Sequence, residues 1–256
     1  MKKLIRIIPS LLINDDYLVK GKNFNNHKYI GDIFNAVKIF SDKKVHEIQL
    51  LDISARKKKK CIDINLIKKI RSEIFVPLSA GGGIENLDQI SELINEGVEK
   101  IILNSAIFNN MNLIAETSNK FGSQSVVVSL DVKKINNEYV VFSNNGTKAE
   151  NINFFKLLKK VQDKGVGEII ITSIDKEGTK SGFDLDLYLK VKDFVKVPLV
   201  ANGGAFKFED IVNLFDKTTA SAVSCGTMFV FFGPRNAVLI NYPEKNIIEK
   251  TMNRHE

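Results

Sequence analysis

The chain has 256 residues, and 44% of them are hydrophobic, which is enough to bury one large core. Its formal charge is +7, but the excess is mostly scattered lysine without aromatic interleaving, so we expect no nucleic-acid partner. No apolar run approaches the ~18 residues of a membrane span, and Arg6 and Pro9 interrupt the first apolar run, unlike in a signal peptide. The two cysteines, Cys61 and Cys225, lack metal-ligand spacing. These features favour a cytoplasmic protein with reduced thiols and no metal or cofactor.

Short apolar runs alternate with longer amphipathic segments along the chain, the pattern of βα units around a parallel sheet. The predicted strands are Leu4–Ile13, Glu47–Ile53, Val76–Ser79, Lys100–Leu103, Ser125–Val132, Glu168–Thr172, Pro198–Ala201 and Ala222–Cys225. The clearest predicted helices are Leu87–Asn95, Asn151–Lys164 and Phe208–Asp216.

Eight such units without a long linker predict an α/β fold, a single (β/α)₈ TIM barrel domain over residues 1–256. We expect a loosely ordered tail from about residue 243 to 256. An open Rossmann-type sheet is disfavoured, because no G-x-G-x-x-G motif joins a first strand to a helix.

An internal repeat indicates two similar half-barrels. Residues 76–108 align without gaps with residues 197–229, an offset of 121. The pairs Pro77 and Pro198, and Phe108 and Phe229, match at this offset, as do the glycine pairs at 82–83 and 203–204. A repeat of this kind predicts two equivalent sites, one in each half.

Polar and glycine residues follow the predicted strands, where a parallel barrel gathers them at its C-terminal rim. Gly-rich turns after the third and seventh strands let backbone N–H groups approach an anion, and each adjoins a small residue after the next strand. Two such cradles suggest a ligand with a phosphate at each end. The alternative is that these glycines only permit tight turns.

Three charged features stand near this rim. Asp131 closes an apolar strand, where a carboxylate is costly unless it is solvated, paired or functional, so we favour a catalytic or ligand-binding role. Lys20 follows the first strand and is either an anion ligand or an exposed loop lysine. The basic run Arg56–Lys60 is typical of a solvated loop, although it could also attract an anionic substrate or an acidic partner.

Several stretches together carry a recognisable pattern. They are RIIPSLL, VKGKNF, GDIFNAVKIF, EIQLLDISA, PLSAGGGI, ILNSAI, FGSQSVVVSLDVKK, GEIIITSIDKEGTKSGFD and PLVANGGA. From about residue 4 to about residue 232 the chain resembles the cyclase subunit of imidazole glycerol phosphate synthase, the HisF-type family. The resemblance implies a barrel with a glutaminase at its N-terminal rim and ammonia passing through the barrel. It also implies a phosphorylated ligand, a bis-phosphate ribonucleotide, at the C-terminal rim.

The resemblance also implies roles for individual residues. Asp131 matches one of two catalytic aspartates, and Lys20 and Asp52 match their neighbours. The implied phosphate ligands are Gly82, Gly83, Asn104 and Ser105 at one end, and Glu177, Gly178, Gly203, Gly204, Gly226 and Thr227 at the other. A charged ring that admits ammonia is matched by Arg6, Glu47, Lys100 and Glu168, which composition alone would describe as ordinary rim ion pairs.

The departures from the family are specific. The family pattern has a cysteine at Ser10 and the other catalytic aspartate at Leu12. Leucine cannot exchange a proton, and such a loss costs ~10²–10⁴-fold in rate when the residue acts in the limiting step. Asp15 and Asp16 fall in the following loop, so we do not expect them to replace it. The C-terminal stretch FFGPRNAVLINYP resembles instead the glycosyl-amidation-associated (WbuZ-type) branch.

Three functions remain open at this point. The first is a paralogue that partners a glutaminase and a sugar amidotransferase and conducts ammonia for amidation of an N-acetylated sugar in surface polysaccharide biosynthesis. The second is a working cyclase of histidine biosynthesis that tolerates Leu12. The third is a non-catalytic scaffold that activates a glutaminase, which two phosphate cradles argue against.

Overall fold

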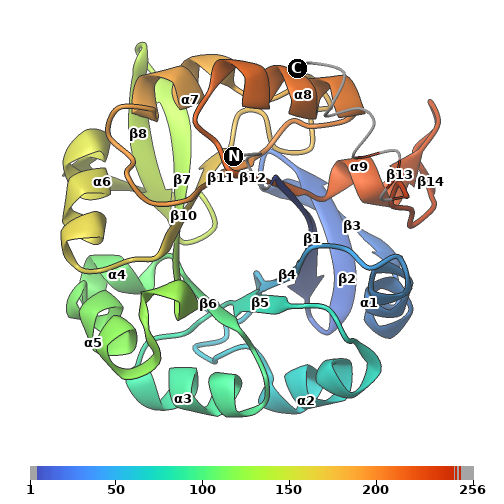
Figure 1. Cartoon of the computed structure of the whole chain (residues 1–256), viewed down its shortest axis with the longest axis horizontal. Helices are drawn as coiled ribbons and strands as arrows, with labels where there is room; N and C mark the ends of the chain where they lie inside the picture. Colours follow the sequence, from blue (N-terminus) through green and yellow to red (C-terminus); the bar gives the residue numbers. More distant parts are fainter. Residues whose placement is uncertain (1–4, 245, 247, 249–256) are drawn as a thin grey trace.

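Eight parallel strands close into a barrel in the computed structural model, which describes residues 5–244, 246 and 248. The barrel strands, in spatial order, are β1 (Arg6–Asn14), β4 (Ile48–Asp52), β5 (Leu78–Gly81), β6 (Lys100–Leu103), β7 (Val126–Ile135), β10 (Glu168–Ser173), β11 (Leu199–Asn202) and β12 (Ala222–Cys225). Pairing of β1 with β12 completes the ring, and helices surround it (Figure 1). The predicted (β/α)₈ TIM barrel is confirmed.

Helices fill the outer layer, and several of them begin at a residue whose side chain caps the first turn. They are α1 (Ile33–Asp42), α2 (Ile64–Glu73), α3 (Leu87–Asn95), α4 (Ala106–Asn109), α5 (Asn112–Phe121), α6 (Phe154–Asp163), α7 (Leu185–Val191), α8 (Phe208–Lys217) and α9 (Thr227–Val230). Asp32, Asp63 and Asn86 each accept a backbone N–H in the first turn of α1, α2 and α3. The predicted helix over 151–164 was wrong at its start, because Asn153 caps α6 and the residues before it form a strand.

Two pairs of antiparallel strands extend from the ends of barrel strands β1 and β7, and neither pair was predicted. We call each pair an excursion. The first consists of β2 (Tyr17–Lys22) and β3 (Asn25–Gly31), and the second of β8 (Glu138–Ser143) and β9 (Lys148–Asn153). Each starts with a two-residue turn, Asp15–Asp16 or Asn136–Asn137, in which both residues have positive φ, as tight hairpins require. Figure 1 shows the two excursions on different sides of the barrel.

The two half-barrels follow the offset seen in the sequence. Helices α1 and α6 start at residues 33 and 154, α2 and α7 at 64 and 185, and α3 and α8 at 87 and 208. Each pair is 121 residues apart, and the two excursions also occupy equivalent places in the two halves. The repeat therefore extends well beyond the segment that aligned without gaps.

The larger core lies between the strands and the helices, and a smaller apolar cluster fills part of the barrel interior. The interior cluster consists of Ile8, Ile102, Val127, Ile170, Val200 and Ala222. At the C-terminal end of the described chain, Tyr242 is buried against Phe40 and Phe229 and donates to the Ile7 carbonyl. Most of the predicted loose tail at 243–256 lies outside the described residues. In the part of the chain that is described, no helix has the length and apolar character of a membrane span.

Tyr188 provides a test of how the helical layer is fixed to the barrel. Its fully buried hydroxyl contacts the carbonyls of Ile171 and Asn202 at 2.8 and 3.0 Å and accepts the Asn202 N–H at 3.0 Å. Tyr188→Phe leaves these buried groups unpaired, so we expect the free energy of unfolding to fall by about 1–3 kcal/mol. Urea denaturation measures this, with the exposed Tyr17→Phe as the control. An equal loss in both variants would contradict it.

Candidate active site and charged ring

A cavity opens at the C-terminal ends of the barrel strands. Its lining includes these predicted site residues: Leu12, Lys20, Asp52, Gly82, Gly83, Asn104, Ser105, Asp131 and Glu177. The remaining predicted phosphate ligands lie outside this lining: Gly178, Gly203, Gly204, Gly226 and Thr227. Glu177 is thus the one predicted ligand of the second phosphate that lines this cavity.

Asp131 is buried at the floor of the cavity, at the end of the apolar part of β7. Asn104 Nδ2 donates to its Oδ2 at 2.9 Å and also to the Ser129 carbonyl at 2.9 Å. Burial raises the pKa of the Asp131 carboxyl to about 6, although hydrogen bonds from Asn104 and Thr172 oppose the shift. A carboxyl with this pKa can accept or donate a proton near neutral pH.

By its pairing in the ladder, Leu12 occupies the place in the first half-barrel that Asp131 occupies in the second, although the two residues are 119 rather than 121 positions apart. Leu12 pairs with Leu51 across the parallel ladder, as Asp131 pairs with Thr172, and residues 51 and 172 are themselves 121 apart. Each also pairs with the first strand of its excursion. Both line the cavity, so only one of two equivalent positions carries an ionisable group.

Lys20 and Glu177 form a buried ion pair beside Asp131, with 3.0 Å between Nζ and Oε1. Lys20 lies on β2 and is only 7% exposed, so the exposed-loop interpretation was wrong. The ammonium is not aligned for a hydrogen bond, and Glu177 Oε1 has no hydrogen-bond donor among the described residues. A Cβ at position 226 would collide with the end of the Lys20 side chain. Glycine at this position therefore leaves space for the Lys20 ammonium.

His27 also lines the cavity and was missed by the sequence analysis. It lies on β3, in an excursion that was not predicted. Burial lowers the pKa of its imidazole, while the charge of Glu177 acts in the opposite direction. The only signal in the sequence was its proximity to Lys20, which becomes informative once β2 and β3 are known to pair.

The glycine turns are explained in part by packing. Gly83 has a φ of +62°, and a Cβ there would collide with the Lys60 carbonyl. Gly204, its counterpart in the other half, has a φ of +102° and faces the Gly182 carbonyl in the same way. Glycine is therefore required at both turns for backbone packing, whether or not a phosphate binds.

Both excursions contribute to the cavity lining. Asn23 Nδ2 donates to the Ile174 and Asp175 carbonyls, each at 2.9 Å, and holds the first excursion against the loop after β10. In the second excursion, Asn144 Oδ1 accepts from Arg56 Nε at 2.6 Å. Arg56 also lines the cavity. The four lysines that follow it are exposed, as expected of a solvated loop.

Asp52 and the cysteines have local structural explanations. Asp52 Oδ1 accepts from the backbone and the hydroxyl of Ser54, both at 2.8 Å, and so organises the turn after β4. Both cysteines are free thiols. Among the described residues, no cluster of three or more His, Cys, Asp or Glu side chains is arranged to hold a metal ion.

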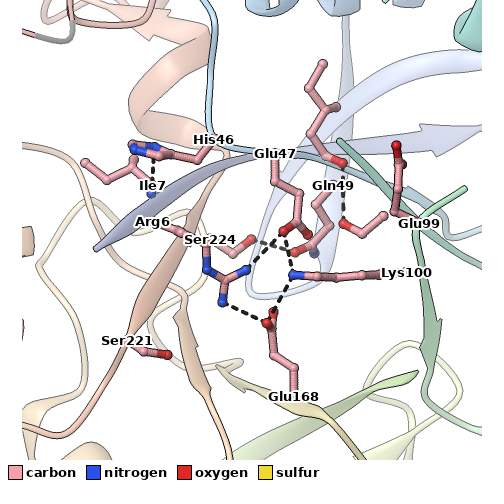
Figure 2. A network of polar contacts seen from close by, with 12 residues as sticks. Arg6, Ile7, His46, Glu47, Gln49, Glu99, Lys100, Glu168, Ser221 and Ser224 are labelled. Atoms are coloured by element: carbon pink, nitrogen blue, oxygen red, sulfur yellow. Dashed lines mark hydrogen bonds and ion pairs between the residues drawn. The ribbon is translucent and has the colours of Figure 1, made fainter. Parts of the chain in front are cut away.

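A charged ring lies at the opposite, N-terminal end of the barrel. Arg6 contacts Glu47 at 3.1 Å and Glu168 at 2.7 Å. Lys100 contacts the same two carboxylates, at 2.7 and 3.1 Å (Figure 2). The four side chains therefore alternate in charge and form a closed, neutral ring across the barrel interior. Both glutamates are less than a tenth exposed, so each depends on its two cations to compensate for lost solvation.

Comparison with known proteins identifies the family. The pattern of the histidine biosynthesis protein family matches residues 6–233. The chain belongs to this family. A Leptospira interrogans protein, provisionally named imidazole glycerol phosphate synthase subunit HisF, is 43% identical over 94% of this chain and 95% of its own length. A Pseudomonas aeruginosa protein with the similarly provisional name of subunit hisF2 is 41% identical over 95% and 98%.

A relative whose name as a HisF subunit is not provisional is also similar to this chain. The imidazole glycerol phosphate synthase subunit HisF of a Hydrogenobaculum strain is 40% identical over 88% of this chain and 90% of its own length. The chain is thus a HisF-type protein along nearly its whole length.

The pKa of Asp131 leads to a pH-dependent prediction. Its folded-state pKa of about 6 lies above the unfolded value of 3.8, so protonation stabilises the fold. That stabilisation is complete below about pH 4 and is lost as pH rises through about 6. Asp131→Asn, which stays neutral, should therefore be more stable than the wild type at pH 7.5 by roughly 1–3 kcal/mol.

Urea denaturation across this pH range measures the difference, which should shrink as the pH falls below 6. The control is Asp63→Asn at the exposed N-cap of α2, where asparagine caps equally well. A pH-independent difference for Asp131→Asn would show that the buried carboxyl does not titrate in this range.

Proposed function

We propose that this HisF-type barrel is the synthase-side partner of a glutaminase and conducts ammonia from its N-terminal rim to the C-terminal cavity. The observation that carries this is the closed ring of Arg6, Glu47, Lys100 and Glu168. A barrel interior is ordinarily packed with branched apolar side chains, so four charges across it are costly unless they have a function. The glutaminase, a HisH-like subunit, would bind over this ring.

The ring suits a gate for a small neutral molecule. Its charges cancel pairwise, so no net charge repels or traps ammonia, and each cation contacts both glutamates directly. Displacing Lys100 alone would open one side of the ring. On the other side, Arg6 would still bridge the two glutamates and hold them in place. Binding of a partner at this rim could therefore control entry by moving one side chain.

At the other end, the site supports a reaction other than the family's cyclisation. With Leu12 opposite Asp131, the cavity contains half of the expected acid–base pair. Passing ammonia to an acceptor requires one proton exchange, for which a single carboxyl with a pKa near neutrality suffices. We therefore favour support of the amidation of an N-acetylated sugar by a sugar amidotransferase, in surface polysaccharide biosynthesis. The predicted phosphate ligands would bind a phosphorylated form of the acceptor.

A second candidate is the cyclase reaction itself, with ammonia and a bis-phosphate ribonucleotide as substrates. The buried Asp131 with its raised pKa favours it, since that group would serve the cyclisation equally well. His27 lies in the same cavity and could supply the second ionisable group.

Removing one cation of the ring tests conduction. In the complex with glutaminase and amidotransferase, Lys100→Met should lower the ratio of glutamine-supported to ammonium-supported product at least tenfold, because ammonia then escapes before transfer. Product formation with each nitrogen source is measured by mass spectrometry, with ¹⁵N in the glutamine amide. The matched control is Lys148→Met, which breaks an ion pair in the second excursion. An unchanged ratio in Lys100→Met would refute conduction through the ring.

Restoring the missing carboxylate tests the choice between the two reactions. With saturating ammonium and the cyclase substrate, the wild type should turn over slowly, and Leu12→Asp should raise kcat by roughly 10²-fold or more. Leu12→Asn is the control, because it is polar but cannot exchange a proton. Wild-type turnover equal to that of a HisF cyclase, with no gain in Leu12→Asp, would favour the second candidate.

A further inference from the structure

One wall of the barrel interior is polar. Ser224, Ser10, Gln49 and Ser79 lie on four neighbouring strands, β12, β1, β4 and β5, and all are at most 3% exposed. Register pairing places Ser10 beside Gln49, and Gln49 beside Ser79. We call these four residues the polar wall. The facing strands contribute apolar residues of the interior cluster, such as Val127 and Ile170.

Hydrogen bonds join the centre of the polar wall. Gln49 Nε2 donates to Ser10 Oγ at 3.4 Å, and Ser224 Oγ donates to Gln49 Oε1 at 3.0 Å. Ser79 Oγ donates to the Ile48 carbonyl at 3.4 Å. A carboxamide has two N–H donors and two oxygen lone pairs. These bonds therefore leave Gln49 with one donor and one lone pair for a further small molecule.

The second half-barrel provides an internal control for this polarity. At the offset of 121, Gln49 corresponds to Ile170 and Ser79 to Val200. Both counterparts are apolar members of the interior cluster. The fold therefore accepts branched apolar residues at these positions, so barrel packing does not require a buried carboxamide and hydroxyl there. Their polarity calls for another explanation, because burying polar groups costs free energy even when they are hydrogen-bonded.

The polar wall spans the distance between the two ends of the interior. Gln49 lies on β4, two residues after Glu47, which directly precedes that strand, so the two side chains point to the same face. Figure 2 shows Gln49 beside the charged ring. At the other end, Ser10 lines the cavity. Gln49 is hydrogen-bonded to that Ser10, so the polar wall reaches from beside the ring to the cavity.

We propose that the Gln49 carboxamide is a binding station for one ammonia molecule in transit. This rests on the proposed conduction. Ammonia has one lone pair and three N–H groups, so it can accept the remaining Gln49 N–H and donate to the remaining Oε1 lone pair. A neutral amide suits neutral ammonia, whereas ammonium would need a counter-charge that this wall lacks. The wall thus keeps the nitrogen in its nucleophilic form between ring and cavity.

The test replaces Gln49 with the residue of its own counterpart. In the glutaminase complex, Gln49→Ile should lower the ratio of glutamine-supported to ammonium-supported product by about three- to tenfold, the effect of losing about one hydrogen bond. Gln49→Met, unbranched and of similar length, should act alike and guards against a packing artefact. Ile170→Val, on the apolar wall, is the matched control and should keep the wild-type ratio. Lys100→Met serves as the reference for loss of conduction.

The outcomes separate this proposal from the one on which it rests. A fall in both Gln49 variants but not in Ile170→Val supports the station. A fall in Lys100→Met alone overturns the station and leaves conduction intact, whereas no fall in any variant overturns both. A crystal structure grown in ammonium gives a readout that needs no acceptor. We expect an electron-density peak of the size of one solvent molecule within hydrogen-bond distance of the Gln49 carboxamide, and we expect Gln49→Ile to lose it. The absence of such a peak in the wild type would overturn the station.

Discussion

Alternation of side chains along β1 is the constraint on which the rest of this barrel depends. Arg6, Ile8, Ser10 and Leu12 follow one another at two-residue steps, so all four point into the barrel. They belong in turn to the charged ring, the apolar interior cluster, the polar wall and the cavity lining. Closure of β1 against β12 on one side and β4 on the other brings the partners of each residue to the same level.

Buried charge is compensated differently at the two ends of the barrel. In the ring, each glutamate contacts two cations, which compensate for its lost solvation. In the cavity, Asp131 has only neutral donors, and burial raises its pKa instead. Lys20 and Glu177 lie between these cases, since they pair but are not aligned for a hydrogen bond. Ion pairing thus compensates for burial at the N-terminal end, whereas at the C-terminal end a buried carboxyl has a raised pKa.

The half-barrel repeat explains why some parts of the molecule were predictable. Strand order and helix positions follow local apolar periodicity, so all eight barrel strands were predicted. Their bounds were less exact: the third was predicted as Val76–Ser79, two residues before the observed Leu78–Gly81. The excursions were missed because β3 and β9 are mostly exposed and polar, and their stability comes from pairing with β2 and β8. His27 was missed with them. The repeat also makes departures visible, in the offset at Gln49 against Ile170 and in the ladder pairing at Leu12 against Asp131.

The sequence by itself determined the barrel, the family, the position of Asp131 at a strand end and the leucine at position 12, because each follows from the order of residues along the chain. Only the tertiary structure decided which side chains meet. Gln49 and Ser224 are 175 positions apart, and Lys20 meets Glu177 only because the first excursion folds back over the barrel. Such contacts depend on closure of the sheet, which no local pattern encodes. The polar wall and the buried ion pair therefore became visible only in the folded molecule.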